Sequence, residues 1–262
     1  MSGINVSKRF ENKRVVITGG AGGIGQTLVS LFLEQGAQVL FSDIDVDACQ
    51  KLQTSYLEAG RKVEYLAGNL REKAFCEALI DQSVKQLGGL DILLNNAGII
   101  PRGDILDTTD DMWFSALDVN LTAVFFLCRA AIPYMKQAGG GAIVNTSSTW
   151  GIYPGPAHVA YCTSKGAVAA LTRNLGRDHA ADGIRVNAVC PNEVNTPMMR
   201  SGFEKRGIDP VNAIADLGKT VPLGHVAEPE EIADVIAFLA STEARYICGE
   251  CIEITGAKAV YG

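Results

Sequence analysis

Two side chains that can exchange a proton lie one helical turn apart in the second half of the chain. Tyr161 and Lys165 are four residues apart at the start of a segment with helical spacing, so both side chains share one face. A phenol with a pKa of about 10 is a poor base at neutral pH, but a nearby ammonium stabilises the phenolate. Ser148, at the end of a predicted strand, is a third candidate. The pair predicts an acid/base group; the alternative is an exposed tyrosine and a solvated lysine on a helix surface.

A second chemical feature is the glycine-rich loop Thr18-Gly-Gly-Ala-Gly-Gly-Ile-Gly25, which follows an apolar run and precedes a helical pattern. Such glycines let the backbone turn tightly and approach a pyrophosphate, which amides at the helix N-terminus can bind. Two registers fit the loop: Gly20, Gly22 and Gly25 match GxGxxG, while Gly19, Gly23 and Gly25 match TGxxxGxG. Both registers predict a dinucleotide site.

An acidic residue supports this reading of the loop. Asp43 ends the second apolar run, 18 residues beyond Gly25. Its carboxylate can accept hydrogen bonds from the adenosine ribose hydroxyls and would repel the extra phosphate of NADP. We therefore expect NAD as the cofactor, although Asp43 can also be read as a turn residue leading into Asp45 and Asp47.

The elements that must position these residues alternate along the chain. Apolar runs of strand length separate segments with helical spacing, such as Ile232, Val235, Ile236 and Leu239. The predicted strands cover residues 14–18, 38–42, 62–66, 91–94, 142–146, 184–189 and 251–254. This alternation predicts an α/β fold, a Rossmann-like, doubly wound sheet of seven parallel strands. Chemistry is then expected beyond the carboxyl ends of the strands.

We expect one domain over residues 1–262, because no repeat or linker interrupts the pattern. The polar, glycine-containing stretch at 195–220 fits the alternation poorly. We interpret it as a lid over the substrate site, with an inconsequential surface excursion as the alternative.

Composition excludes several classes. A net charge of −6 argues against a nucleic-acid partner, since such proteins usually carry a concentrated basic surface. Residues 1–10 lack the apolar run of a signal peptide and no stretch resembles a membrane span, so we expect a cytoplasmic protein. The seven scattered cysteines are expected to be reduced thiols. Cys248 and Cys251 form a CxxC without a second ligand pair, so we expect no metal.

The motifs together resemble the short-chain dehydrogenase/reductase family over nearly the whole chain. The resemblance depends on TGGAGGIG at 18–25, LLNNAG at 93–98, Asn120, IVNTSS at 143–148, YCTSK at 161–165 and VNAVCPNEVNTPM at 186–198. They occur in the order usual for that family, and Ser148 precedes Tyr161 by 13 residues, as the family pattern requires.

The resemblance implies catalytic roles. Tyr161 would deprotonate an alcohol as hydride leaves its carbon, or protonate a ketone in reverse. Ser148 would hydrogen-bond the same oxygen. Lys165 would lower the pKa of Tyr161 and bind the nicotinamide ribose, and Asn120 would hold a water in a proton relay to Lys165.

The resemblance also implies the remaining cofactor contacts. Asn69 and Leu70 would flank the adenine, and Val194 and Thr196 would lie at the nicotinamide carboxamide. The other contacts are expected from the glycine loop and the segment after the fourth strand: Gly19, Gly22, Gly23, Ile24, Gly25, Asn96, Ala97 and Gly98.

The chain departs from the family pattern after Pro191, where Asn192 and Glu193 replace the usual glycine. Asn tolerates left-handed backbone geometry, so we expect the loop to form. Glu193 either faces the substrate or points to solvent.

The candidate substrate contacts are a polar and aromatic mixture: Arg102, Ser148, Trp150, Tyr153, His158, Glu193 and Met199, with Met198, Arg200 and Phe203 in the predicted lid. Arg102 and His158 can pair with a carboxylate, phosphate or sulfonate, or are ordinary surface charges.

We therefore expect an NAD-dependent dehydrogenase that oxidises a hydroxyl of a sugar, sugar acid or polyol, with anionic compounds included among the candidates. The alternatives are a reductase of 3-oxoacyl groups or cyclic ketones, and a catalytically silent NAD-binding scaffold or sensor. The resemblance further implies a homotetramer that packs through the helices starting near Asp110 and Tyr161. Their apolar side chains serve that interface or the core: Ala123, Val124, Phe126, Leu127, Ala167, Val168 and Leu171.

Overall fold

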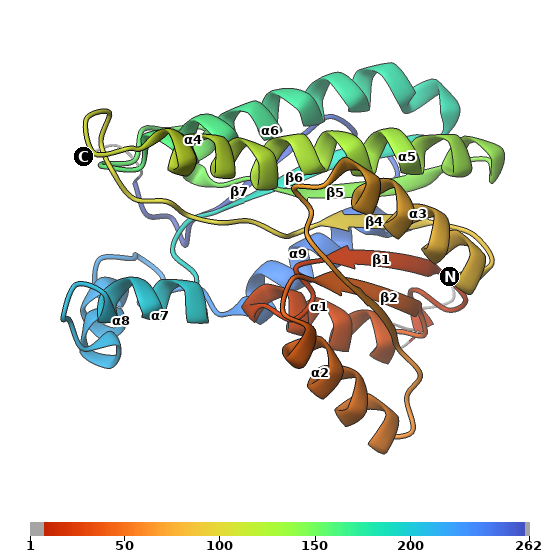
Figure 1. Ribbon diagram of the computed structural model, residues 1–262, viewed down its shortest axis with the longest axis horizontal. Helices are drawn as coiled ribbons and strands as arrows, with labels where there is room; N and C mark the ends of the chain where they lie inside the picture. Colours follow the sequence, from red (N-terminus) through yellow and green to blue (C-terminus); the bar gives the residue numbers. More distant parts are fainter. Residues whose placement is uncertain (1–7, 260–262) are drawn as a thin grey trace.

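Seven parallel strands form the centre of the protein, in the spatial order β3-β2-β1-β4-β5-β6-β7 (Figure 1). The structure is a computed structural model that describes residues 8–259. The strands are β1 (Arg14–Thr18), β2 (Gln38–Asp43), β3 (Glu64–Ala67), β4 (Ile92–Asn95), β5 (Gly141–Thr146), β6 (Ile184–Pro191) and β7 (Cys251–Ile254). Strand β1 pairs with β2 on one side and with β4 on the other, so the strand order reverses there. The predicted α/β, Rossmann-like, doubly wound single domain is confirmed.

Helices cover both faces of the sheet (Figure 1). They are α1 (Gly23–Glu34), α2 (Val46–Glu58), α3 (Lys73–Leu87), α4 (Asp110–Leu117), α5 (Ala123–Gln137), α6 (Val159–His179), α7 (Pro197–Glu204), α8 (Pro210–Gly218) and α9 (Pro229–Ala240). Helices α1, α2 and α9 lie on one face, and α3, α4, α5 and α6 on the other.

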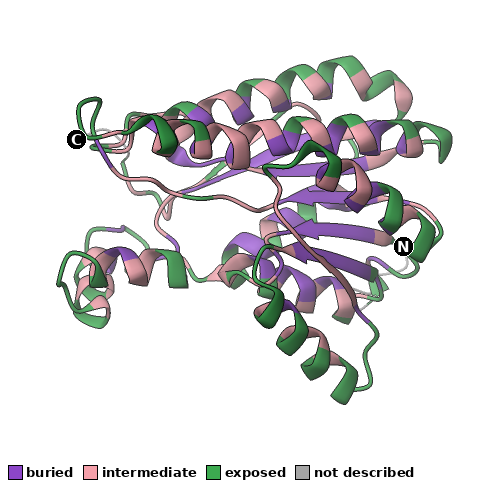
Figure 2. Ribbon diagram, in the orientation of Figure 1, coloured by how far each residue is buried: buried purple, intermediate pink, exposed green. Residues whose placement is uncertain are grey.

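Successive residues of the central strand explain the two layers. Val15 and Ile17 belong to the core that includes Phe32 of α1, whereas Val16 belongs to the core that includes Leu79 of α3. Successive side chains of a strand point to opposite faces, so a strand covered on both sides is apolar on consecutive residues. The strands accordingly form the buried layer in Figure 2.

The predicted strand positions are confirmed, with ends that differ by one or two residues. Strand β3 starts at Glu64 rather than residue 62, because its pairing with β2 begins there. Strand β6 continues to Pro191 rather than residue 189, because β7 pairs with it as far as Ile254.

The helical run Asp110–Gln137 corrects one expectation. By length and composition it could cross a membrane, contrary to the expectation that no stretch resembles a span. Its buried residues, such as Leu127 and Met135, pack into the core over the sheet, and this packing explains its apolar character. The run is also not one regular helix, since a π-helical turn at Asp118–Thr122 separates α4 from α5. Asn120 lies in that turn, and π turns often occur at functional sites.

The segment predicted as a lid contains two short helices, α7 and α8, that stand away from the sheet (Figure 1). Thr196 and Asp209 cap them by accepting backbone hydrogen bonds from Met199 and Asn212, and Pro197 and Pro210 occupy the first helical positions. Local capping therefore fixes where each of these helices begins.

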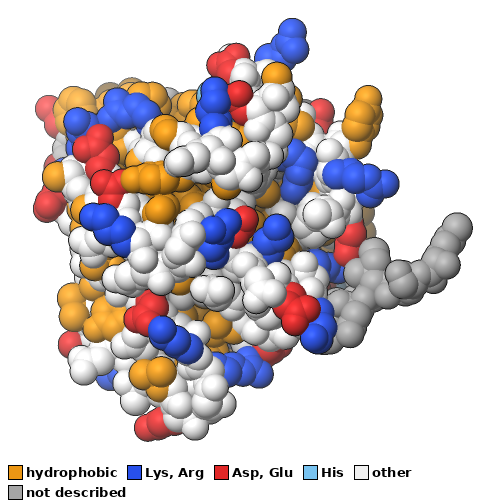
Figure 3. Space-filling model, turned by 90° about the vertical axis from the view of Figure 1, so that its right-hand side faces the viewer, with side chains coloured by type: hydrophobic (Ala, Val, Ile, Leu, Met, Phe, Trp, Pro, Cys, Tyr) orange, Lys and Arg blue, Asp and Glu red, His pale blue; other side chains and the backbone are white. Residues whose placement is uncertain are grey.

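The end of the molecule opposite this segment is seen in Figure 3. Lys and Arg side chains alternate there with Asp and Glu side chains over the visible surface. This face therefore lacks, among the side chains in view, the continuous basic stripe typical of nucleic-acid binding.

Candidate active site

The glycine loop after β1 forms a close-packed turn that only glycine fits at two positions. Gly19 has φ +66°, and an added Cβ would lie 2.8 Å from Cα of Ala97. A Cβ on Gly25 would overlap the carbonyl oxygen of Gly19. Gly22, the N-cap of α1, would instead place a Cβ 3.4 Å from that oxygen.

The first turn of α1 suits an anion. No side chain caps it and no acidic residue occupies it, so its amides keep their binding capacity. A pyrophosphate fits this cradle, which has the backbone donors and the absence of side chains that such a group requires.

Asn96 fastens the glycine loop to the end of β4. Its amide nitrogen Nδ2 donates to the carbonyl oxygens of Thr18 (3.2 Å) and Gly19 (3.3 Å). The backbone N–H groups of Asn96 and Ala97 donate to Oγ1 of Thr18 at 3.1 and 3.2 Å. The segment 96–98 thus lies beside the loop, at the place where the family contacts were expected.

Asp43 ends β2 with its carboxylate directed at the glycine loop. Oδ2 accepts from the backbone N–H of Ala21 at 3.1 Å, and Oδ1 accepts from that of Ile44 at 2.8 Å. The turn-residue alternative is thus partly right, because Oδ1 also accepts from Asp45 at 3.3 Å. Contact with the ribose stays a prediction that this turn role permits, since a carboxylate oxygen accepts more than one hydrogen bond.

The expected adenine contacts follow β3 on the same edge. The backbone N–H of Gly68 donates to the carbonyl oxygen of Asp43 at 3.0 Å, which places Asn69 and Leu70 next to that acid. Oδ1 of Asn69 accepts from the backbone N–H of Arg71 at 3.1 Å.

Ser148, Tyr161 and Lys165 line one cleft of about 400 Å³. Lys165 is 4% exposed, and its Nζ donates to the carbonyl oxygen of Thr146 at 2.7 Å. Oγ of Ser148 accepts from the backbone N–H of Trp150 at 3.1 Å, and the ring of Tyr161 contacts the ring of Trp150. The cleft also reaches Ile24, Asn96, Gly98, Val194 and Thr196, so it joins the catalytic residues to the expected cofactor contacts.

The pKa values differ from the expectation that Lys165 lowers the pKa of Tyr161. Burial raises the pKa of Tyr161 to about 12, although a hydrogen bond with Ser148 opposes the shift. Burial lowers the pKa of Lys165 to about 8. Desolvation therefore dominates both groups, because each is taken out of water while the Lys165 ammonium donates to a backbone carbonyl. The Tyr161 phenol is protonated at neutral pH in this structure.

Asn120 is a buried positioning residue. Its Oδ1 accepts from the backbone N–H of Ile99 at 2.8 Å, and its Nδ2 donates to the carbonyl oxygen of Ile99 (2.9 Å) and to Oγ of Ser164 (3.0 Å). The side chain thereby joins the segment after β4 to helix α6. A Cβ on Gly98 would lie 3.2 Å from both Oδ1 of Asn120 and Nζ of Lys165, so these two groups flank that glycine.

The loop after Pro191 forms, as expected, but without left-handed geometry at Asn192. Among the described non-glycine residues, positive φ angles occur at Asn12, Ala157 and Ala257. Pairing holds the loop instead: Asn192 donates to the carbonyl oxygen of Ile254 at 3.0 Å, and Asn195 to that of Ala227 at 2.8 Å.

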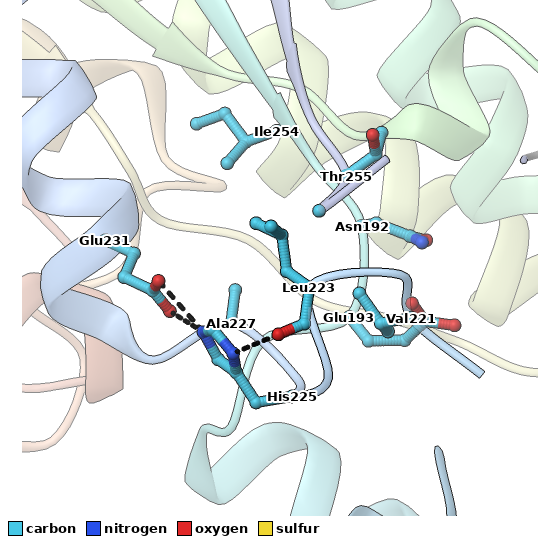
Figure 4. A pocket seen from close by; sticks show the side chains of 10 residues that line it. Asn192, Glu193, Val221, Leu223, His225, Ala227, Glu231, Ile254 and Thr255 are labelled. Atoms are coloured by element: carbon cyan, nitrogen blue, oxygen red, sulfur yellow. Dashed lines mark hydrogen bonds and ion pairs between the residues drawn. The ribbon is translucent and has the colours of Figure 1, made fainter. Parts of the chain in front are cut away.

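Glu193 lines the cleft, and its carboxylate contacts Nζ of Lys258 at 2.6 Å. Glu193 also borders a smaller cavity behind the loop, shown in Figure 4, where Nε2 of His225 lies 3.0 Å from both carboxylate oxygens of Glu231. Of the two predicted orientations, the one toward the cleft agrees with this position, and an ion pair with Lys258 engages the charge of Glu193.

The other predicted substrate residues divide into two groups. Arg102, Trp150, His158 and Met199 line the cleft together with Met198 and Phe203. Tyr153 does not belong to this lining, and its hydroxyl donates to Glu253 at 3.0 Å. The sequence interpretation missed Arg206 and Leu217 in the lining, and Lys258 behind Glu193. The spacing of Phe203 and Arg206 on one helical face was a signal that could have found Arg206.

The cysteines are free thiols, as expected. Over residues 8–259, no three His, Cys, Asp or Glu side chains come together as metal ligands.

Comparisons with known proteins agree with this site. A family model described as enoyl-(acyl carrier protein) reductase matches residues 19–256. A 3α-hydroxysteroid dehydrogenase of Mediterraneibacter gnavus is 38% identical over 95% of this chain and 97% of its own length. A meso-2,3-butanediol dehydrogenase of Serratia marcescens is 37% identical over 95% of both chains.

Among solved structures, levodione reductase superposes with a TM-score of 0.91 at 28% identity, covering 97% of this chain and 100% of that one. The family model and these relatives agree with the glycine loop and with the cleft that contains Ser148, Tyr161 and Lys165. The chain therefore belongs to the short-chain dehydrogenase/reductase family, whose members are oxidoreductases that act on CH–OH or ketone groups.

Proposed function

We propose that this protein is an NAD-dependent dehydrogenase that oxidises a hydroxyl group of a small polar molecule such as a sugar, sugar acid or polyol. The observation that carries the proposal is the single cleft that Ser148, Tyr161 and Lys165 share with the glycine-loop residue Ile24 and with Asn96. Proton transfer and hydride transfer must occur at one carbon and its oxygen, so both sets of groups have to border the same space.

The residues divide the reaction between them. A bound nicotinamide supplies the hydride acceptor in oxidation and the hydride donor in reduction. Tyr161 exchanges the proton of the reacting oxygen, and Ser148 holds that oxygen through its hydroxyl. Lys165, buried beside Tyr161, stabilises the phenolate once it forms, since an opposite charge favours the ionised state in a site of low dielectric.

NAD rather than NADP is proposed because of Asp43. Its carboxylate lies at the end of β2 beside the glycine loop, where Ala21 donates to it. The extra ribose phosphate of NADP would lie close to this carboxylate and be repelled by it, whereas the ribose hydroxyls of NAD can donate hydrogen bonds to it.

The size and lining of the cleft support a small polar substrate. The volume of about 400 Å³ includes the space beside the expected cofactor contacts, so the part left for a substrate is smaller, and Arg102, His158 and Asn192 supply polar groups in its lining. The relatives are named for a steroid and for butanediol, so the class of hydroxyl compound is the least constrained part of the proposal.

Reduction of a 3-oxoacyl group is the second candidate, favoured by the acyl carrier protein in the name of the matching family model. A silent NAD-binding scaffold is disfavoured, because Ser148, Tyr161 and Lys165 are all present in the cleft.

We also propose a cytoplasmic homotetramer that packs through α4, α5 and α6. Of the residues expected there, Ala123, Val124, Leu127 and Val168 are buried in the core of one chain. Phe114 and Phe125 are instead 57% and 43% exposed, so they are the better candidates for contacts between chains. Light scattering of the purified protein tests this directly.

The experiment that tests the function follows reduced nicotinamide at 340 nm with NAD and, separately, with NADP. The panel contains neutral sugars, sugar acids, polyols, hydroxy acids and secondary alcohols. Turnover with NAD and weaker turnover with NADP supports the proposal. Silence with NAD, together with NADPH oxidation on a 3-oxoacyl thioester, would replace it by the second candidate.

A further inference from the structure

Three side chains that can carry positive charge gather at the lid end of the cleft: Arg102, His158 and Arg206. Arg102 follows β4, and His158 directly precedes α6. The two segments lie side by side, since Gly103 donates to the carbonyl oxygen of Ala157 at 2.8 Å and accepts from Val159 at 3.3 Å.

The two arginines meet at one residue of the lid. The guanidinium of Arg102 lies where a side chain on Gly202 of α7 would project. Nε of Arg206 donates to the carbonyl oxygen of Gly202 at 3.0 Å, and its guanidinium lies over the ring of Phe203. Arg102, which follows β4, and Arg206, from the lid segment, thus present positive charge to the same wall of the cleft.

This positive charge is not neutralised within the described chain. Neither Arg102 nor Arg206 forms an ion pair with a carboxylate of residues 8–259. Glu193 is the one acidic residue among the described residues that line the cleft, and Lys258 pairs with it at 2.6 Å. A cationic wall in a chain of net charge −6 is a local feature that overall composition does not explain.

His158 is oriented to add a hydrogen-bonding group. Its Nδ1 lies 2.6 Å from the carbonyl oxygen of Pro156, and a carbonyl only accepts, so Nδ1 carries the hydrogen. Nε2 becomes a donor to an oxyanion when the ring is protonated. Burial and the neighbouring Arg102 and Arg206 hold the pKa of His158 below its ordinary value, so the two arginines carry the permanent charge of this wall. The residue also sits at the N-terminus of a 21-residue helix, where the helix dipole favours negative charge.

We propose that Arg102, Arg206 and His158 form a subsite for an oxyanion group of the substrate, a carboxylate, sulfonate or phosphate. This inference rests on the proposed function and narrows it to anionic hydroxyl compounds. The subsite lies close to the chemistry, because His158 precedes Tyr161 by three residues and the Trp150 ring contacts both rings, with centroid separations of 4.6 Å and 6.3 Å. The oxyanion and the reacting carbon therefore belong to one small molecule.

The arrangement also links binding to the lid. An oxyanion that accepts from Arg102 and Arg206 together bridges the core and the lid segment, so binding of an anionic substrate holds the lid over the cleft.

The first test compares matched substrates that differ in charge. The sets are 2,3-butanediol with 3-hydroxybutyrate, glucose with glucuronate and glucose 6-phosphate, and cyclohexanol with 3-hydroxycyclohexanesulfonate. We expect the anionic member to have the higher kcat/KM, and the best set to show whether carboxylate, phosphate or sulfonate is preferred. Equal or higher kcat/KM for every neutral member would overturn the inference while leaving NAD-dependent oxidation standing.

Variants then assign the preference to residues. Arg102→Gln and Arg206→Gln should each raise KM for the anionic substrate on the order of 10- to 100-fold, the range for losing a charge-assisted hydrogen bond. KM for the neutral member should change by less than about 2-fold. Lys205→Gln is the matched control, because it removes one positive charge from the exposed neighbour of Arg206, outside the cleft lining.

A binding measurement covers the case in which no panel member is turned over. With Trp113→Phe, Trp150 beside His158 is the remaining tryptophan. Its fluorescence, titrated with benzoate, benzenesulfonate and benzyl alcohol, should report tighter binding of the two anions, lost on Arg206→Gln. Anion binding without turnover would support the subsite and contradict the proposed function. Equal binding of benzyl alcohol, or binding unaffected by Arg206→Gln, would contradict the subsite.

Discussion

The two ends of the cleft are built on different principles. At the cofactor end, polar side chains are fixed by the backbone: Asn96 donates to Thr18 and Gly19, and Asp43 accepts from Ala21 and Ile44. At the lid end, Arg102 and Arg206 come from segments outside the sheet, and neither pairs with a described carboxylate. The comparison shows that backbone contacts of the sheet position the cofactor end, whereas the lid end is formed by side chains on connecting segments, where we expect substrate preference to be decided.

The largest effect that separates the two ends is expected from Ser148→Ala. Removing the hydroxyl that holds the reacting oxygen should lower kcat by about 10²- to 10³-fold, the range for one oxyanion-type donor. NAD affinity, measured by titration calorimetry, should stay within about 2-fold, because the glycine loop is untouched. Ser148→Thr, which keeps a hydroxyl, is the control. Turnover by Ser148→Ala close to that of the wild type would remove this residue from the catalytic set.

The next effect concerns the cofactor end. Gly25→Ala places a Cβ against the carbonyl oxygen of Gly19, so we expect a loss of about 1–3 kcal/mol in the free energy of unfolding and weaker NAD binding. Gly22→Ala is the matched variant, because its Cβ would lie 3.4 Å from the same oxygen and should cost less than about 1 kcal/mol. Urea unfolding checks both. Equal stability of the two variants would contradict the close packing of the loop.

A smaller effect is expected from Asp43→Asn. The substitution removes the charge that opposes the ribose phosphate of NADP and keeps one of the two oxygens, so the hydrogen bond from either Ala21 or Ile44 is lost. The ratio of kcat/KM for NAD to that for NADP should fall on the order of 10-fold, equivalent to about 1.4 kcal/mol. Asp47→Asn, in the first turn of α2, should leave the ratio unchanged. An unchanged ratio for Asp43→Asn would leave the cofactor preference without its proposed cause.

The last prediction concerns the protonation state of the Tyr161 phenol in the protein without nucleotide. Burial disfavours the phenolate of Tyr161, so its pKa lies above the ordinary value, at about 12. The proton is therefore retained throughout the neutral and mildly alkaline range and lost only as the pH approaches 12. Tyrosinate absorbance of the wild type minus that of Tyr161→Phe, in the absence of nucleotide, should accordingly stay flat up to about pH 10. A difference signal with a midpoint below pH 10 would show that Lys165 outweighs burial.

The sequence predicted where the glycine loop and Asp43 lie, at the ends of β1 and β2, because these signals are local. The glycine loop, the strand before it and Asp43 are contiguous patterns with a physical cause in the turn and the helix N-terminus. Strand ends were displaced by one or two residues because pairing with the neighbouring strand decides them, as for Glu64 and Pro191.

The lid end was predicted less completely because its contacts join distant segments. Arg206 becomes part of the cleft through the placement of α7, and Lys258 pairs with a glutamate 65 residues earlier. The raised pKa of Tyr161 could not be predicted, since spacing shows the neighbouring ammonium but not the depth of burial. The hydrogen bonds of the Asn120 side chain with Ile99 and Ser164 likewise could not be predicted, because they join segments that only tertiary packing brings together.

The most direct test of the central claim compares the wild type with Tyr161→Phe at saturating NAD, using the best substrate of the panel. NADH formation at 340 nm and NAD affinity are measured on the same samples. The account predicts that Tyr161→Phe keeps NAD affinity within about 2-fold and loses about 10²- to 10⁴-fold in kcat, the range for a general acid/base. Undiminished NADH formation by Tyr161→Phe would contradict the claim that this phenol exchanges the substrate proton.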